Sequence, residues 1–151
     1  MPERKLKILI AIGSMQEGGS EGQVLELLKG LRARGHDARL LILHGKGALL
    51  EKVRATNIPL FVVDLPKLRP LTNPSGKAKV LRVFWRTRRM IRQFRPDIFH
   101  CWLFEAEAWG ALVKASGVPG AFLTSRRSLG VYKSAAPWKQ SAQNAMNLIT
   151  R

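Results

Sequence analysis

One segment near the N-terminus constrains the fold more than any other. Residues 7–12 (Lys-Ile-Leu-Ile-Ala-Ile) form a short apolar run that is typical of a buried strand. A glycine-rich stretch follows at residues 13–19, and Ser20 and Gln23 then have the spacing of a capping box that opens a helix. In parallel α/β proteins this order brings backbone N–H groups close to an anionic ligand. The segment therefore predicts an α/β fold with an anion-binding loop.

The remainder of the chain continues to alternate strands and helices. Near-continuous apolar strands joined by helices are typical of a parallel sheet that is covered on both faces, and right-handed crossovers make such a sheet doubly wound. Further strands are predicted at residues 39–43, 60–63, 97–100 and 120–124, and helices at 20–34, 49–53, 77–94, 105–116 and from about 137. Residues 147–150 look like the start of a sixth strand, so residues 1–151 are expected to form one Rossmann-like domain that is incomplete at its C-terminus.

Composition narrows the class of protein and its compartment. A chain of 151 residues is long enough to bury one core, which predicts a single domain. One cysteine, Cys101, excludes a disulfide framework and fits a reducing compartment. The apolar run at residues 7–12 is too short for a signal sequence or a membrane span. We therefore expect a cytoplasmic location, with a peripheral position on the cytoplasmic face of a membrane as a further possibility.

The net charge of +16 is concentrated in the second half of the chain. Residues 1–66 hold ten Lys and Arg against seven Asp and Glu, whereas residues 67–151 hold sixteen against three. Such asymmetry indicates an anionic partner, which is a phosphate ester, a nucleic acid or an acidic membrane surface. Nucleic acid is disfavoured because the sequence has no recognition motif and few interleaved aromatic residues.

The predicted helix at residues 77–94 carries much of this charge. On a helical wheel one face is an ordinary core face, formed by Val80, Val83, Phe84, Thr87, Met90, Ile91 and Phe94. The opposite face combines apolar Leu81 and Trp85 with four arginines: Arg82, Arg88, Arg89 and Arg92. Cations, tryptophan and leucine together are typical of a helix that lies on a membrane surface. A solvated face with incidental apolar residues is the alternative.

The glycine-rich loop does not match the common nucleotide-binding motifs. Its glycines are not spaced as G-x-G-x-x-G, and His44 and Gly45 follow the second strand where a dinucleotide site would have an acidic residue. Gly19 is followed by Ser20, so there is no Walker lysine. A nicotinamide or ATP site is therefore disfavoured. Glycines that merely permit a tight turn remain the alternative to a ligand-binding loop.

Four further residues are predicted to lie near the carboxyl edge of the sheet, where parallel α/β proteins bind ligands. His100 ends the predicted fourth strand, and Trp102 beside it would form a flat wall for a sugar or a lipid, or would pack on the sheet. After the fifth strand, Arg126 and Arg127 suit the recognition of phosphate or carboxylate. The structural alternatives are a packed histidine and a solvated turn. No catalytic triad, carboxylate pair or metal-ligand cluster can be assembled.

Five segments together resemble a known family. They are residues 7–12, the Glu-Gly-Gly-Ser-Glu loop at 17–21, residues 27–36, the Arg-Pro-Asp-Ile-Phe-His segment at 95–100 and the Ser-Arg-Arg-Ser loop at 125–128. In this order they resemble the N-terminal part of family 4 glycosyltransferases, which have the GT-B fold. The resemblance runs from about residue 6 to the end of the chain.

The resemblance implies the N-terminal, acceptor-binding lobe of a two-lobed enzyme that transfers a sugar from a nucleotide-sugar with retention, without a metal or another cofactor. Gly18 and Gly19 match the loop that approaches the donor diphosphate or the transferred sugar, and His100 matches a histidine that faces the cleft. Arg126 or Arg127 would lie on the acceptor side. Trp102 stands where a second histidine often occurs, which is a departure from the pattern.

The resemblance also implies partners. The acceptor would be a glycan or a lipid-linked group, and the donor-binding lobe, which this sequence lacks, would be a separate polypeptide or be lost. The chain alone is expected to be inactive. The alternative function is a non-catalytic subunit of a split transferase that binds the acceptor or a membrane, or an inactive fragment.

Overall fold

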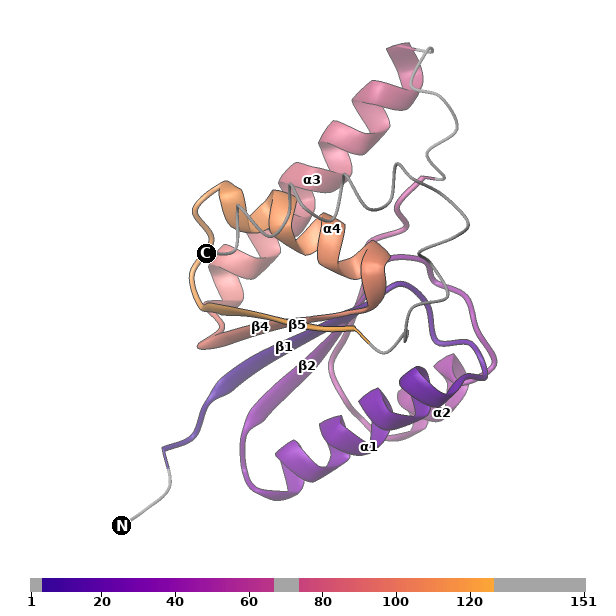
Figure 1. Cartoon of the computed structure of the whole chain (residues 1–151), viewed down its shortest axis with the longest axis vertical. Coiled ribbons are helices and arrows are strands. Elements are labelled where there is room, and N and C mark those ends of the chain that lie inside the picture. Colours follow the sequence, from indigo (N-terminus) through magenta and orange to yellow (C-terminus); the bar gives the residue numbers. More distant parts are fainter. Residues whose placement is uncertain (1–3, 67–73, 127–151) are drawn as a thin grey trace.

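The structure, a computed structural model, describes residues 4–66 and 74–126 (Figure 1). In these residues strands and helices alternate as predicted. The elements are β1 (Lys7–Ile12), α1 (Gly19–Ala33), β2 (Asp37–Ile42), α2 (Leu50–Ala55), β3 (Leu60–Val62), α3 (Pro74–Phe94), β4 (Ile98–Trp102), α4 (Leu103–Ala115) and β5 (Ala121–Ser125). The helix predicted from residue 137 and the strand predicted at 147–150 lie outside the described residues.

The strands form one sheet in the order β3-β2-β1-β4-β5, and every neighbouring pair is parallel. The chain starts in the centre at β1 and moves outward through β2 and β3. It then returns through α3 to β4, on the other side of β1. This reversal puts a topological switch point between β1 and β4, at the carboxyl edge where ligands bind in such sheets. The predicted doubly wound parallel sheet is confirmed.

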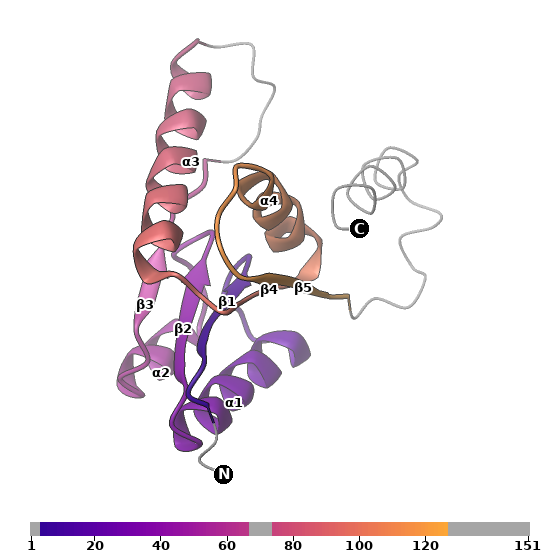
Figure 2. The ribbon, with the colours of Figure 1, turned by 90° about the vertical axis from the view of Figure 1, so that its left-hand side faces the viewer.

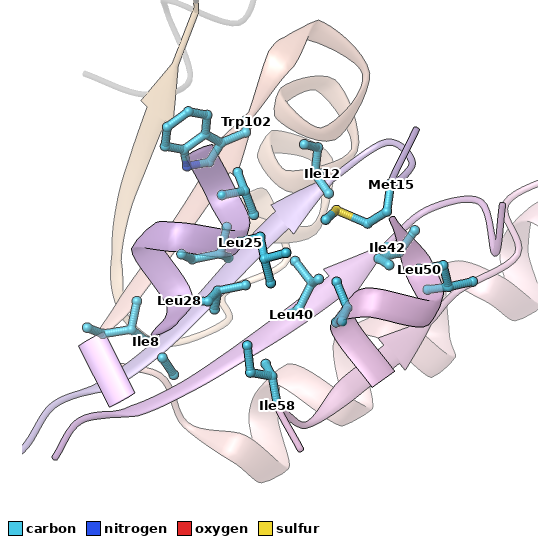
Figure 3. Close-up of a cluster of buried hydrophobic side chains, with 14 residues drawn as sticks. Ile8, Ile12, Met15, Leu25, Leu28, Leu40, Ile42, Leu50, Ile58 and Trp102 are labelled. Atoms are coloured by element: carbon cyan, nitrogen blue, oxygen red, sulfur yellow. The ribbon is translucent and has the colours of Figure 1, made fainter. Parts of the chain in front are cut away.

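Helices cover both faces of the sheet (Figure 2). On one face, α1 and α2 enclose a core cluster that includes Ile8, Ile10 and Ile12 (Figure 3). On the other face, α3 and α4 enclose a second cluster that includes Leu9 and Ala11. Because successive side chains of a strand point to opposite faces, a strand covered on both sides has to be apolar at every position. This is the physical reason for the uninterrupted apolar run at the start of the sequence.

Several element boundaries differ from the predicted ones by one to three residues, and two of these differences bear on the site. Gly18, not Ser20, is the N-cap of α1, and no side chain caps the helix, so the predicted capping box is wrong. Gly18 is extended, and its carbonyl oxygen accepts the first helical hydrogen bond, from the N–H of Gly22 at 3.1 Å. The fourth strand continues past His100 to Trp102, because Trp102 still pairs with Ile12 of β1 and with β5.

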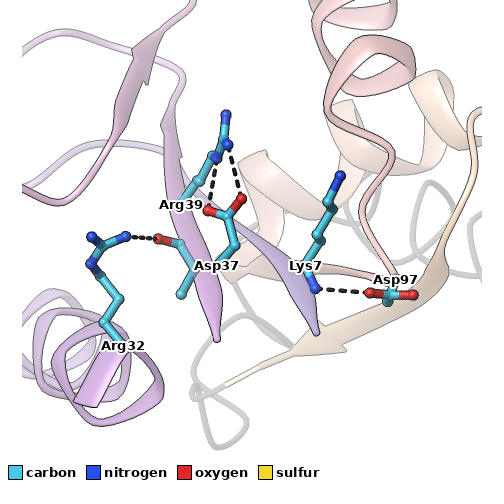
Figure 4. A network of polar contacts seen from close by, with 6 residues as sticks. Lys7, Arg32, Asp37, Arg39 and Asp97 are labelled. Atoms are coloured by element: carbon cyan, nitrogen blue, oxygen red, sulfur yellow. Dashed lines mark hydrogen bonds and ion pairs between the residues drawn. The ribbon is translucent and has the colours of Figure 1, made fainter. Parts of the chain in front are cut away.

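Ion pairs and side-chain hydrogen bonds fix the amino edge of the sheet (Figure 4). Asp97 accepts a hydrogen bond from the backbone N–H of Lys7 at 2.8 Å, at the end of β1 opposite to the switch point. Asp37 accepts two from the Arg39 guanidinium at 3.0 and 2.8 Å, and these bonds lower the pKa of the Asp37 carboxyl. The acidic groups at this edge therefore have structural partners.

One glycine sets the distance between α4 and the sheet. A Cβ atom on Gly110 would lie 2.3 Å from the Cys101 sulfur and 3.1 Å from the Phe122 ring. The absence of a side chain at Gly110 therefore lets α4 pack closely on β4 and β5, which are the strands next to the switch point.

We predict that Gly110→Ala lowers the free energy of unfolding by about 1–3 kcal/mol, because the added methyl group has to displace buried neighbours. Gly30→Ala is the matched control, since Gly30 is an exposed position inside α1 with no atom within 4 Å of an added Cβ. There alanine is expected to stabilise the helix by about 0.5–1 kcal/mol. Urea denaturation measures both changes, and equal stability of Gly110→Ala and the wild type would contradict the packing argument.

Candidate functional site at the carboxyl edge of the sheet

The loops that follow β1 and β2 are hydrogen-bonded to each other. The N–H of His44 donates to the Gly13 carbonyl at 2.8 Å, the N–H of Met15 donates to Lys46 at 3.1 Å, and the N–H of Leu49 donates to Met15 at 2.9 Å. The Met15 side chain is fully buried in the core (Figure 3). Backbone bonds and a buried anchor therefore hold the glycine-rich loop in one conformation.

Gly47 makes this arrangement possible. Its φ is +129°, and a Cβ atom there would lie 1.9 Å from the Met15 carbonyl oxygen. Both observations require glycine, since other residues rarely adopt this φ and any side chain would overlap the backbone. The close contact between the two loops therefore depends on the glycine of the second loop, which the sequence did not single out.

Gly18 and Gly19 lie exposed at the start of α1. Nothing lies within 4 Å of a Cβ built on Gly19, so the backbone at this position borders open space. The N–H groups of a first helical turn have no partner within the helix and favour negative charge. No side chain caps this helix by a hydrogen bond, and the Glu21 carboxylate of the first turn lies beside Gly18.

His44 and Glu105 meet at the switch point. The His44 Nε2 and Glu105 Oε1 atoms are 2.6 Å apart, and Glu105 Oε2 lies 2.8 Å from the place of a Cβ on Gly13. His44 follows β2, and Glu105 is in the first turn of α4, directly after β4. From the sequence, His44 counted only against a dinucleotide site. Both residues directly follow parallel strands, and this signal in the sequence could have placed them together.

His100 points to the α1 face of the sheet, two residues before the end of β4. The Trp102 Nε1–H donates to His100 Nδ1 at 3.3 Å, and His100 Nε2 lies 2.8 Å from Ser125 Oγ. Because an indole nitrogen only donates, Nδ1 has to be the acceptor, and Nε2 carries the proton and donates to Ser125. Burial lowers the pKa of His100, so the ring is held in its neutral form.

Trp102 belongs to the core. Its side chain packs in the cluster between the sheet and α1, and the residue is 6% exposed (Figure 3). The expected flat wall for a sugar or lipid is therefore wrong, and the alternative, packing on the sheet, describes the residue. The reason is register: Trp102 shares the face of Ile98 and His100, which α1 partly covers.

Arg126 is held by a buried carboxylate. Its Nε donates to both oxygens of Glu107, at 3.0 and 2.8 Å, and the Glu107 side chain on α4 is only 4% exposed. Removing one partner of such a pair leaves a buried charge without compensation. Side chains alternate between the two faces of the sheet along the chain. Ser125 contacts His100 on the α1 face, so the next residue, Arg126, is directed to the α4 face, where it meets Glu107. The structure therefore does not bring these two predicted site residues together, and Arg127 lies outside the described residues.

Helix α3 buries the predicted face and exposes the predicted opposite face. Thr87, Ile91 and Phe94 are buried. Leu81 and Trp85 are 57% and 53% exposed. Arg88 stacks on Trp85, with its guanidinium carbon 5.2 Å from the ring centroid, and the other cations of this face, Arg82, Arg89 and Arg92, are exposed. The first turns of α3 project beyond α4 (Figures 1 and 2).

Neither a candidate metal cluster nor a candidate membrane span occurs in the part of the chain that the structure describes. No group of three or more His, Cys, Asp or Glu residues there could hold a metal ion. None of the described helices combines the length and the apolar character that crossing a bilayer requires.

Comparison with known proteins decides the family. The sequence pattern of Glycosyltransferase Family 4 matches residues 17–132, which is most of the chain. The chain belongs to glycosyltransferase family 4. The match includes Gly18 and Gly19 of the glycine-rich loop and β4, and it extends past the end of β5. No curated protein sequence matches the chain significantly.

Solved structures support the fold assignment of this family 4 domain. MurG from Acinetobacter baumannii has a TM-score of 0.62 at 18% identity, covering 98% of this chain and 40% of MurG. Two further matches are weaker. The calicheamicin glycosyltransferase CalG4 has a TM-score of 0.48 at 15% identity, covering 95% of this chain and 38% of CalG4. The C-terminal domain of the PF1911 hydrogenase from Pyrococcus furiosus has a TM-score of 0.49 at 20% identity, covering 85% of this chain and 96% of that domain, and both TM-scores are too low to establish a common fold. The chain thus has the fold of a Rossmann-like GT-B lobe and spans 40% of the length of MurG.

We predict that acidification destabilises the family 4 domain through His100. Below the ordinary histidine pKa of 6.5 the unfolded chain takes up a proton that the folded chain resists, because the pKa of His100 is lowered in the folded state. The free energy of unfolding therefore falls as the pH falls through this range. His100→Asn keeps an acceptor near the Trp102 indole and is expected to flatten the dependence. Urea denaturation between about pH 7 and pH 5 measures it, and the same slope in both proteins would contradict the assignment.

Proposed function

We propose that this family 4 domain is the acceptor-binding lobe of a retaining enzyme that transfers a sugar from a nucleotide-sugar to a glycan or lipid-linked acceptor, together with a C-terminal donor lobe. The observation that carries the proposal is the family match across residues 17–132, on a sheet whose switch point has an exposed glycine-rich loop. The domain would contribute by holding the acceptor hydroxyl in line with the donor, which removes much of the entropic cost of the reaction.

Gly18 and Gly19 would supply part of the electrostatic stabilisation. The uncapped first turn of α1 offers backbone N–H donors to the donor diphosphate or to the transferred sugar, and such fixed donors stabilise the charge that develops on the leaving phosphate. The nucleotide-sugar enters as a substrate, and the proposed reaction uses no resident metal or other cofactor.

Transfer is predicted to require the second lobe. The purified 151-residue chain, incubated with radiolabelled nucleotide-sugars and a lipid or glycan extract, is expected to give no labelled product. The donor lobe, on the same polypeptide or on a separate one, is expected to restore transfer. In the complete enzyme Gly19→Asp should raise the KM for the nucleotide-sugar without loss of stability, because the side chain enters open space but repels the diphosphate. Gly19→Asn is the uncharged control. Robust transfer by the chain alone would contradict the proposal.

A second proposal concerns where the domain works. Helix α3 contains seven Lys and Arg residues and no Asp or Glu. Among the described ion pairs none involves an α3 cation, so this charge is not neutralised within the described part of the domain. Exposed Leu81 and Trp85 lie among these cations. Basic residues attract anionic lipids while apolar side chains enter the interface, and we infer that α3 holds the domain peripherally on the cytoplasmic face of an anionic membrane.

Vesicle flotation tests this second proposal. The domain is expected to float with vesicles that contain phosphatidylglycerol at low salt, to bind less at high salt, and not to float with pure phosphatidylcholine. The double variants Leu81→Ser/Trp85→Ser and Arg82→Ala/Arg89→Ala should each weaken flotation. Leu123→Ser is the matched control, because Leu123 on β5 is 46% exposed and shares the α1 face of the sheet with His100, opposite to α3. Absence of binding at low salt, or an equal loss with the control, would refute it and would leave the transferase proposal untouched.

A further inference from the structure

The pair formed by His44 and Glu105 has no role in the function proposed so far. Three elements build it: His44 leaves the end of β2, Glu105 stands in the first turn of α4, and Gly13 at the end of β1 lies between them. The pair therefore lies at the switch point, on the same carboxyl edge as the glycine-rich loop, and parallel α/β sheets bind ligands in the crevice outside this edge.

The backbone fixes the pair in place. The N–H of His44 donates to the Gly13 carbonyl, and Gly13 has no side chain where Glu105 Oε2 lies. β4 passes into α4 without a loop, and Leu103 at this junction has a φ of +67°. A leucine in the left-handed region is unfavourable and persists only where the surroundings impose it. The direct turn brings Glu105 over the end of β1.

Glu105 is unusual among the carboxylates of this basic chain. Five described carboxylates form ion pairs with lysine or arginine: Glu26, Asp37, Glu51, Asp97 and Glu107. The partner of Glu105 is a histidine, although the chain contains 26 Lys and Arg residues. The Glu105 side chain is 54% exposed, so a ligand in the crevice can reach it.

The chemistry of the pair selects hydrogen-bond donors. A carboxylate only accepts hydrogen bonds, and Glu105 keeps acceptor positions beside the one that His44 Nε2 occupies. In the described residues His44 Nδ1 has no hydrogen-bond partner. The exposed Glu105 carboxylate suits hydroxyl groups and repels phosphate, in contrast to the N–H donors at the start of α1.

We propose that His44 and Glu105 form a hydroxyl-binding site, which takes the sugar or polyol hydroxyls of the acceptor substrate. This role rests on the proposed transferase function. One end of the crevice, at Gly18 and Gly19, then offers hydrogen-bond donors to the phosphate, and the other end offers hydrogen-bond acceptors to the hydroxyls. His44 and Glu105 act as binding residues, and the proposal assigns them no proton transfer.

Steady-state kinetics of the complete enzyme test the site. Glu105→Gln and His44→Asn are each expected to raise the KM for the acceptor about tenfold, as for the loss of a charged hydrogen bond, with the KM for the nucleotide-sugar unchanged. Glu51→Gln is the control, since this exposed carboxylate on α2 is paired with Arg54 and lies outside the crevice. Unchanged acceptor KM in both variants, or a rise confined to the donor KM, would overturn the proposal.

A binding measurement separates this proposal from the transferase assignment. The chain has three histidines, so the ring signals of His44 can be assigned by NMR with His44→Asn. Methyl glycosides of the common hexoses, at millimolar concentration, are expected to shift the His44 signals and not those of His36, and Glu105→Gln should abolish the response. Inorganic phosphate is expected to have no effect. A response to glycosides, together with no sugar transfer even when the donor lobe is present, would refute the transferase and keep the hydroxyl site. A response to phosphate alone, or none to any glycoside, would refute the site.

Discussion

The burial of strand β1 on all sides is the constraint on which the rest of the structure depends. β1 is hydrogen-bonded to β2 and β4 along both edges, and both of its faces are covered by helices. No position of the strand after the exposed Lys7 can hold a polar group without losing stability, so polar groups that could act on a ligand lie where the chain leaves the sheet. Gly13 is this point. It is buried, and it leaves room for the carboxylate of Glu105 from the first turn of α4.

The carboxyl edge is rigid for a related reason. A loop that leaves a buried strand has backbone groups that need partners, and here the loop after β2 supplies them through Lys46 and Leu49. The contact is so close that Gly47 has to lack a side chain. A loop held in this way does not need to order itself when a ligand binds, which lowers the entropic cost of binding.

Sequence reasoning predicted local and periodic features well. The alternation of strands and helices follows from apolar runs that end at glycines, and the buried face of α3 follows from the helical spacing of its apolar residues. Contacts between distant residues leave no periodic signal, although strand ends can place residues at one edge of the sheet. Arg126 pairs with Glu107 across 19 positions, and His44 pairs with Glu105 across 61. Register decided the rest, because β4 continues to Trp102 and thereby buries that ring and places His100 inside the strand.

Helix α3 couples the two proposed surfaces. It is the crossover that returns the chain from β3 to β4, so its buried residues, such as Ile91 and Phe94, help to place β4 beside β1 and thereby create the switch point. Its outer face is the cationic surface. A substitution in the buried face would therefore disturb the crevice and the surface together. Exposed residues such as Arg82 and Leu81 can be changed without altering the core. Substitutions at such exposed positions therefore test attachment to a membrane separately from the chemistry of the crevice.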